Sequence, residues 1–148
     1  MATLREQIVA AIVTALSAGS PPATVYRTRR AAFQEGAAFE AIVVRPQRAL
    51  NEEVSRPHAP LTRQRFTVEI EMFATGTATD RPDKVVDALY EWVVQKLVGN
   101  NLGQIAHGIT EGDSVFDWGD AGEYANVKLT TEMIVSFSYI ANDPTRKT

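Results

Sequence analysis

A long segment near the end of the chain alternates regularly between apolar and polar residues. From Asn126 to Ile140, the odd positions are mostly apolar and the even positions mostly polar. Successive side chains of a strand point to opposite faces, so the pattern predicts a strand with one face on a core and the other toward water or a partner. The apolar positions are Val127, Leu129, Met133, Val135, Phe137 and Tyr139, and the polar ones are Lys128, Thr130, Glu132, Ser136 and Ser138.

A second long strand is predicted over Thr62–Ala74 by the same alternation. Its apolar face would carry Phe66, Val68, Ile70 and Met72, and its polar face Thr67, Glu69 and Glu71. Shorter strands are predicted at Thr24–Arg27 and Ala41–Arg45. We expect Pro46 to end the second of these, because proline has no amide to donate to a sheet ladder.

The C-terminal part of the chain has the pattern of a hairpin. Strands are predicted at Ile105–Thr110 and Ser114–Trp118, and the turn residues 119–122 then lead into the terminal strand. The polar residues Asp143–Thr148 are predicted to form a frayed, flexible tail.

The first helix is predicted over Thr3–Ser20. Thr3 and Glu6 have the spacing of a capping box, in which each side chain satisfies a backbone amide at the helix start. Gly19 is a suitable left-handed residue at the helix end. One apolar stripe would consist of Leu4, Ile8, Ala11, Ile12, Ala15 and Leu16.

The second helix is predicted to begin after a cap at Thr79 or Asp80, with Pro82 in its first turn, where a missing amide costs little. Gly99 and Asn100 would close it. Its core face would consist of Val85, Val86, Leu89, Val93 and Leu97.

These elements predict one α+β domain over residues 1–148, with two helices on one face of a mainly antiparallel sheet. The length of 148 residues, 45% hydrophobic and 22% charged, suits a single core. The chain has no cysteine, which excludes disulfides, thiolate metal sites and cysteine nucleophiles. No signal-peptide pattern and no membrane-spanning apolar run is expected.

Charge is distributed unevenly along the chain, although the net charge is only −3. Between Arg27 and Arg65 lie eight arginines and four glutamates, which is +4, and the rest carries seven bases and fourteen acids, which is −7. Complementary patches orient association between copies, whereas interleaved charges would only solvate the surface. The sequence leaves open whether these charges form complementary patches or interleave on the surface. Nucleic-acid binding is not favoured, because the chain is net acidic and has no aromatic interleaving among the arginines.

Two segments have no clear regular structure. Arg29–Gly36 fits either one helical turn or a loop, and Gln47–Leu61 carries Pro57 and Pro60 around His58. A loop as long as the second is uncommon in a compact domain, so it is either mobile or used for contact.

Candidate chemistry is sparse. His58 and His107 are the only histidines, and their positions do not give metal-ligand spacing. An acidic run without an intervening base does not match a calcium loop, and indicates either a solvated edge or a contact to arginines of another subunit. Its members are Glu111, Asp113, Asp117, Asp120 and Glu123. We expect no catalytic, cofactor or metal site and no enzymatic activity.

The combined pattern resembles the tail terminator (tail completion, minor tail) proteins of long-tailed bacteriophages, over nearly the whole chain. The likeness lies in the order and style of the elements. These are the helix Leu4–Ala18, the segment Val25–Arg29, the strands Ala41–Pro46 and Phe66–Phe73, the helix Pro82–Val98 and the closing strand Val127–Tyr139.

The resemblance implies a virion protein, assembled in the host cytoplasm, that forms a homohexameric ring on the head-proximal end of the tail tube. Such a ring stops tube polymerisation and offers the surface for head attachment. Its implied partners are its own copies, the tail tube protein and the head–tail connector protein. DNA would pass through without specific binding, and no membrane contact is implied.

Within that hypothesis, two residue sets are candidate interfaces. The long loop would contact the tube or the connector, and the polar strand faces with nearby arginines would form subunit contacts. The loop set is Arg48, Glu52, Glu53, Arg56 and His58, and the subunit set is Arg29, Arg30, Glu69, Glu71 and Glu132.

Three alternative classes remain open. A neck, head-completion or connector protein would cap a different partner. A tail-tube subunit would polymerise by itself, whereas a terminator stops at a ring. A small enzyme is the weakest alternative, because no nucleophile, base and orienting partner stand together in the sequence.

Overall fold

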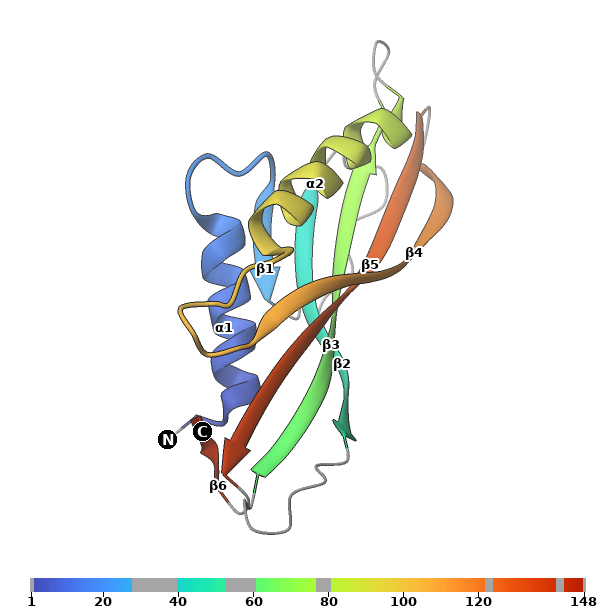
Figure 1. The fold of residues 1–148 in the computed structure, drawn as a ribbon. Helices are drawn as coiled ribbons and strands as arrows, with labels where there is room; N and C mark the ends of the chain where they lie inside the picture. The colour runs from blue at the N-terminus through green and yellow to red at the C-terminus, as the bar shows by residue number, and fades with distance from the viewer. Residues whose placement is uncertain are drawn as a thin grey trace.

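The computed structural model describes residues 2–27, 40–52, 61–76, 81–121, 124–140 and 143–147. Within these ranges the chain forms two helices and six strands (Figure 1). Their order is α1 (Leu4–Ser17), β1 (Thr24–Arg27), β2 (Ala41–Glu52), β3 (Leu61–Thr75), α2 (Pro82–Leu97), β4 (Gly108–Ala121), β5 (Tyr124–Ile140) and β6 (Asp143–Lys147).

The strands form one sheet in the order β1-β2-β3-β5-β4, and β6 pairs with β5 beside the end of β4. Only the β1–β2 pair is parallel among these strands, and α1 and α2 pack on the same side of the sheet (Figure 1). The predicted α+β class, a mainly antiparallel sheet covered on one face by two helices, is therefore confirmed.

The two long alternating strands pair with each other at the centre of the sheet, as β3 and β5. Their predicted apolar faces are the buried ones, and they meet the apolar stripes of both helices in a single core. The opposite face is only partly exposed, since Thr67, Glu71 and Ser138 are also buried.

The predicted end of the second strand at Pro46 is wrong. β2 continues to Glu52, with an irregular register against β3 between Pro46 and Arg48. β1 pairs with β2 only as far as Val44, so Pro46 lies where β2 has no described strand on its other side. Proline is tolerated on edge strands and at bulges, because the missing amide breaks no ladder bond there.

The strands predicted at Ile105–Thr110 and Ser114–Trp118 are one strand, β4, which begins only at Gly108 and has an irregularity between Glu111 and Ser114. Gly112 lies at this irregularity, where a Cβ would stand 3.1 Å from the Cβ of Glu132. The hairpin with β5 is confirmed, but the predicted turn at 119–122 is wrong in its position. Residues 119–121 still belong to β4, and the ladder closes at the pair Ala121 and Tyr124.

The predicted tail is also corrected. Asp143–Lys147 form the short strand β6, in which the Asp143 carboxylate accepts a hydrogen bond from the Thr145 hydroxyl at 2.5 Å. Gly108, the first residue of β4, pairs with Ser136, so Tyr139 and Ile140 of β5 extend past β4 and provide the backbone partners of β6. Local composition does not reveal such an edge.

The observed starts of the two helices agree only in part with those predicted from the sequence. The Thr3 hydroxyl accepts from the Glu6 amide at 3.2 Å as predicted, but the Glu6 carboxylate bonds Arg27, so the reciprocal half of the capping box is replaced. Helix α2 has Pro82 in its first turn as predicted, but its cap is Arg81, without a side-chain hydrogen bond. Neither described helix has the length and apolarity needed to cross a membrane.

Candidate assembly surfaces

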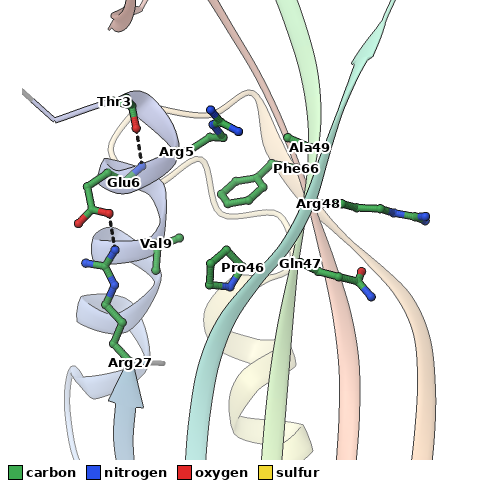
Figure 2. A pocket seen from close by; sticks show the side chains of 10 residues that line it. All are labelled: Thr3, Arg5, Glu6, Val9, Arg27, Pro46, Gln47, Arg48, Ala49 and Phe66. Carbon is green, nitrogen blue, oxygen red and sulfur yellow. Dashed lines mark hydrogen bonds and ion pairs between the residues drawn. The ribbon is translucent and has the colours of Figure 1, made fainter. Parts of the chain in front are cut away.

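A groove of about 380 Å³ lies between α1 and β2 (Figure 2). Val9, Pro46 and Phe66 point into the space between the helix and the strand, whereas Gln47 and Arg48 point away from α1. The ladder agrees with this view. Pro46 and Ala49 pair with the core-facing residues Val68 and Phe66, while Arg48 pairs with Thr67 on the opposite face. Beneath α1 the groove is therefore lined by the apolar residues Val9, Pro46, Ala49 and Phe66, and its other lining residues are polar or charged.

The groove exists because β1 is short. Its four residues pair with β2 from Ala41 to Val44, and no described strand continues on that side of β2 from Arg45 to Glu52. Among the described residues, the backbone of this half of β2 therefore has no strand partner at the side of the groove, as at a sheet edge.

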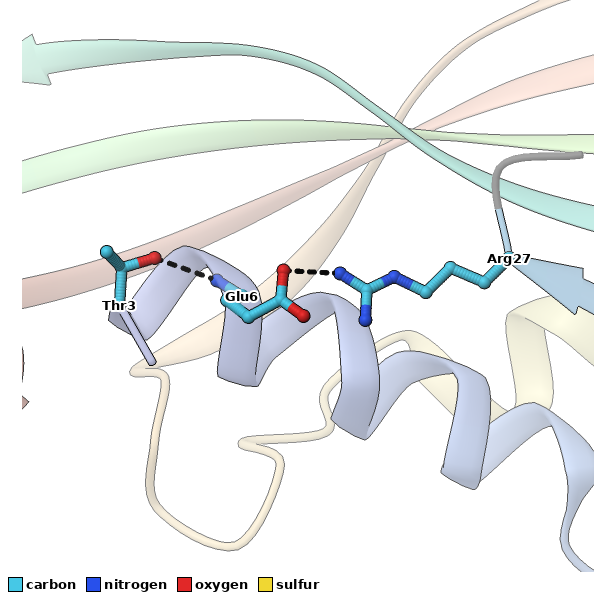
Figure 3. A network of polar contacts seen from close by, with 3 residues as sticks. All are labelled: Thr3, Glu6 and Arg27. Atoms are coloured by element: carbon cyan, nitrogen blue, oxygen red, sulfur yellow. Dashed lines mark hydrogen bonds and ion pairs between the residues drawn. The ribbon is translucent and has the colours of Figure 1, made fainter. Parts of the chain in front are cut away.

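One rim of the groove is basic and partly neutralised. Arg27 donates a hydrogen bond from Nη2 to Glu6 Oε2 at 2.5 Å, while the Glu6 amide is held by Thr3 (Figure 3). This bond lowers the pKa of the exposed Glu6 carboxyl and raises the pKa of Arg27. Arg5, which also lines the groove, has no ion pair with another described residue. Arg5 is therefore a cation of this rim that no described carboxylate neutralises.

The sheet face opposite the helices carries three of the predicted subunit-interface residues, Glu69, Glu71 and Glu132. Glu71 is already engaged within the chain, because its carboxylate lies 2.9 Å from Nη1 of Arg45 and its side chain is only 7% exposed. Glu69 accepts a hydrogen bond from Gln47 Nε2 at 2.7 Å. Glu132 stands directly opposite Glu69 in the ladder. Glu69 and Glu132 are thus the members best placed to meet a neighbouring molecule.

The predicted contact loop is placed differently by the structure. Arg48 and Glu52 lie in β2, and the side chain of Glu52 approaches Arg65 Nε at 3.7 Å. The remaining loop candidates, Glu53, Arg56 and His58, lie outside the described residues, and so do Arg29 and Arg30 of the subunit set. The structure therefore does not bring either set together as a whole.

The most exposed apolar surface among the described residues is on β4. Val115, Phe116 and Trp118 are 58%, 51% and 60% exposed. Phe116 and Trp118 pair with the core residues Leu129 and Val127, so they stand on the helix-covered side of the sheet but beyond its cover. β4 is the last strand in the sheet order, and its outer edge has no described strand partner. Long exposed apolar edges of this kind are typical of interaction sites.

The acids of this segment are candidates from the sequence, whereas its aromatic residues are not predicted there to form a surface. The signal was the spacing of Phe116 and Trp118 by two positions within a polar strand, which places both on one face. Only their exposure in the folded chain shows that neither described helix covers these two side chains.

The acidic run is divided by the alternation of β4. Glu111 accepts a hydrogen bond from the Tyr90 hydroxyl, which raises the pKa of Tyr90. Asp117 lies 3.8 Å from Lys128 Nζ on the other face, and Asp113 is exposed. The part of the chain that the structure describes holds no group of three residues able to bind a metal ion.

Elsewhere in the described part of the chain, few polar or ionisable side chains are grouped as in a catalytic or binding site. His107 Nε2 lies within hydrogen-bonding distance, 2.9 Å, of the Ser138 hydroxyl. A second hollow of about 290 Å³ beside the start of α1 has no ionisable side chain in its lining. That lining consists of Leu4, Gln7, Gly103, Gln104, Ile105 and Thr145.

Comparison with known proteins gives a likeness of structure but not of sequence. No protein-family model and no curated protein matches this chain. The fold is similar to that of a chain in the virion of a native gene transfer agent (GTA) particle, with a TM-score of 0.50 and 13% sequence identity. The match covers 87% of this chain and 94% of that one. At this identity, the likeness concerns the fold.

Proposed function

We propose that this protein is a structural component of a phage-like particle and that, within the particle, it is the tail terminator. It would form a homohexameric ring on the head-proximal end of the tail tube, stop tube polymerisation and present the surface for head attachment. The observation that carries the proposal is the shared fold with a chain of a gene transfer agent virion, which extends over most of both chains.

The surfaces of the molecule support assembly into a ring. A ring requires heterologous contacts, in which one patch meets a different patch on the next copy. The described residues provide two unlike open edges, an acidic and aromatic one on β4 and one beside the groove on β2. Such a ring does not require a self-complementary patch of the kind that forms two-fold dimers.

The charge of the chain is compatible with DNA passing through such a ring. Nucleic-acid binding by proteins depends largely on cations placed along the phosphates. This chain has a net charge of −3, and Glu69, Glu71 and Glu132 share one sheet face. We therefore propose that DNA passes without specific binding, and that the partners are the tail tube protein and the connector protein in the virion.

The proposal can be tested with the purified full chain, its mass measured under native conditions and its shape by negative-stain imaging, with and without purified tail tubes. A six-fold ring at one end of each tube, with no further growth of those tubes, is the expected result. A monomer that ignores tubes contradicts it. Tubes formed by the protein alone would indicate a tube subunit, and a ring that binds only the head connector would indicate a neck protein.

A further inference from the structure

Two edges of the sheet have no described strand partner, one on β4 and one on β2. β4 has exposed aromatic side chains and an outer edge with no described strand partner. From Arg45 to Glu52, β2 likewise has no described strand partner on the side of the groove, where Pro46 and Ala49 are apolar lining residues. When an extended strand is added to an open edge, the main chain supplies the hydrogen bonds and alternate side chains fill pockets on one face. The β4 edge thus offers the aromatic side chains, and the β2 edge offers the groove that could receive them.

The side chains of both edges fall on matching faces. Phe116 and Trp118 lie on the helix-covered side of the sheet, as do Pro46 and Ala49, which line the groove. In a ring built by rotation, the covered sides of all copies face the same way, so the aromatic rings of one copy would enter the groove of the next. Residues two apart in a strand are separated by roughly 7 Å, which lets both rings enter one groove.

Charge is also complementary, on the opposite face. Asp117 lies on the uncovered side of β4, 3.8 Å from Lys128 Nζ but with its side chain 65% exposed. Arg48 points to the uncovered side of β2. Arg48 has no ion pair with another described residue. If β4 were added to this edge, the Asp117 carboxylate would be brought beside the Arg48 guanidinium, and such pairs fix register and select the partner.

We propose that the β4 edge of one copy docks on the outer edge of β2 in a second copy, with Phe116 and Trp118 in the groove beneath α1 and Asp117 beside Arg48. This inference names the subunit contact of the proposed ring and rests on that proposed function. Repeated around the ring, the contact joins the sheets of successive copies edge to edge.

The absence of native cysteine allows a clean cross-linking test. One variant carries Ala49→Cys, and four others carry a single cysteine at position 115, 116, 117 or 118. Each of the four is mixed with the first under mild oxidation in the assembled state. Adjacent strands hold facing residues close enough for a disulfide. We expect cysteine 49 to cross-link to a cysteine at position 116 or 118 and not to one at 115 or 117. This expectation holds whichever direction the docked strand runs.

A charge exchange tests the opposite face. Arg48→Asp alone and Asp117→Arg alone should each cause loss of the assembled mass, and the two together in one chain should restore it. Arg81→Asp, a reversal of equal size at the start of α2, should leave assembly unchanged. Circular dichroism of each variant establishes that the chain is folded.

The outcomes separate this contact from the proposed function. A ring that caps tubes without the alternating cross-links overturns the contact and leaves the terminator role standing. Alternating cross-links between copies that never cap tubes support the contact and contradict the terminator role. An Ala49→Cys chain that cross-links to the tube protein instead of a second copy overturns the contact, and so does a chain that stays monomeric.

Discussion

Glu69 on β3 and Glu132 on β5 are direct cross-strand partners on the sheet face opposite the helices. Glu69 accepts a hydrogen bond from Gln47, but no cation of the described residues is paired with either carboxylate. Like charges directly opposite each other destabilise a strand pair. Arg45 is the cross-strand neighbour of Glu69 on β2, but its guanidinium is paired with Glu71. We therefore expect a repulsion between Glu69 and Glu132 in the single chain, which an arginine of a neighbouring molecule would relieve.

Removal of this repulsion should stabilise the single chain. We expect Glu132→Gln to raise the free energy of unfolding by about 0.5 kcal/mol at neutral pH and low salt, measured by urea denaturation. Glu69→Gln should have a similar effect, and the double variant should add little, because either change alone ends the repulsion. Additive gains that persist in high salt would count against the pairing.

Loss of Arg45 should be more damaging than loss of Arg48, although both are arginines of β2. Arg45→Ala leaves the buried Glu71 carboxylate without its partner, and we expect it to lower the free energy of unfolding by roughly 1–3 kcal/mol. Arg48→Ala is the matched control, with little effect expected on the single chain. Addition of Glu71→Gln to Arg45→Ala should recover part of the loss, because a neutral amide is easier to bury. Equal effects of the two arginine variants would contradict this account.

Trp92 connects the two helices by one hydrogen bond. Its Nε1 donates to the carbonyl of Leu16 at 2.9 Å, in the last turn of α1, where backbone carbonyls have no partner within the helix. Trp92→Phe should therefore lower the free energy of unfolding by about 1 kcal/mol in thermal or chemical denaturation. Trp118→Phe is the control, and we expect it to leave the stability of the single chain nearly unchanged because that ring is exposed.

The Glu6–Arg27 pair should make stability depend on pH. Because the folded-state pKa of Glu6 is depressed by Arg27, the contribution of the pair is present above the ordinary glutamate pKa and is lost as pH falls through the lowered value. Arg27→Gln should thus reduce stability at neutral pH and have no effect at strongly acidic pH. NMR titration of the Glu6 carboxyl should show its pKa return toward the ordinary value in the variant. An unchanged titration would exclude the pair.

Trp118 should report assembly by its fluorescence. In a Trp92→Phe chain, Trp118 is the only tryptophan, and its exposure predicts a red emission maximum with strong acrylamide quenching. Burial in the groove of another copy should shift the emission to the blue and reduce the quenching as the protein concentration rises. Emission that stays red in a formed ring would place Trp118 outside the subunit contact.

The alternation of β3 and β5 and the apolar stripes of the two helices determined much of the fold. These patterns arise because side-chain direction repeats every two residues in a strand and about every 3.6 in a helix. A long segment therefore reveals its own buried face, and the class of the fold follows from the order of such segments.

Local pattern was less informative where an element depends on its neighbours. Pro46 lies within β2 because β1 has ended beside it, and Asp143–Lys147 form β6 because β5 extends beyond β4. Glu6 bonds Arg27 and not its own helix start, because the fold brings β1 next to α1. Each of these outcomes is set by a partner distant in the sequence.

The sequence by itself determined which residues of the long strands and helices face the core. Only the tertiary structure decided which surfaces stay open. Phe116 and Trp118 have the same local pattern as buried strand residues, and they are exposed only because β4 is the outermost strand and the helices end short of it. Exposure depends on what other elements cover, and the order of strands in a sheet is not encoded in the alternation of any one strand.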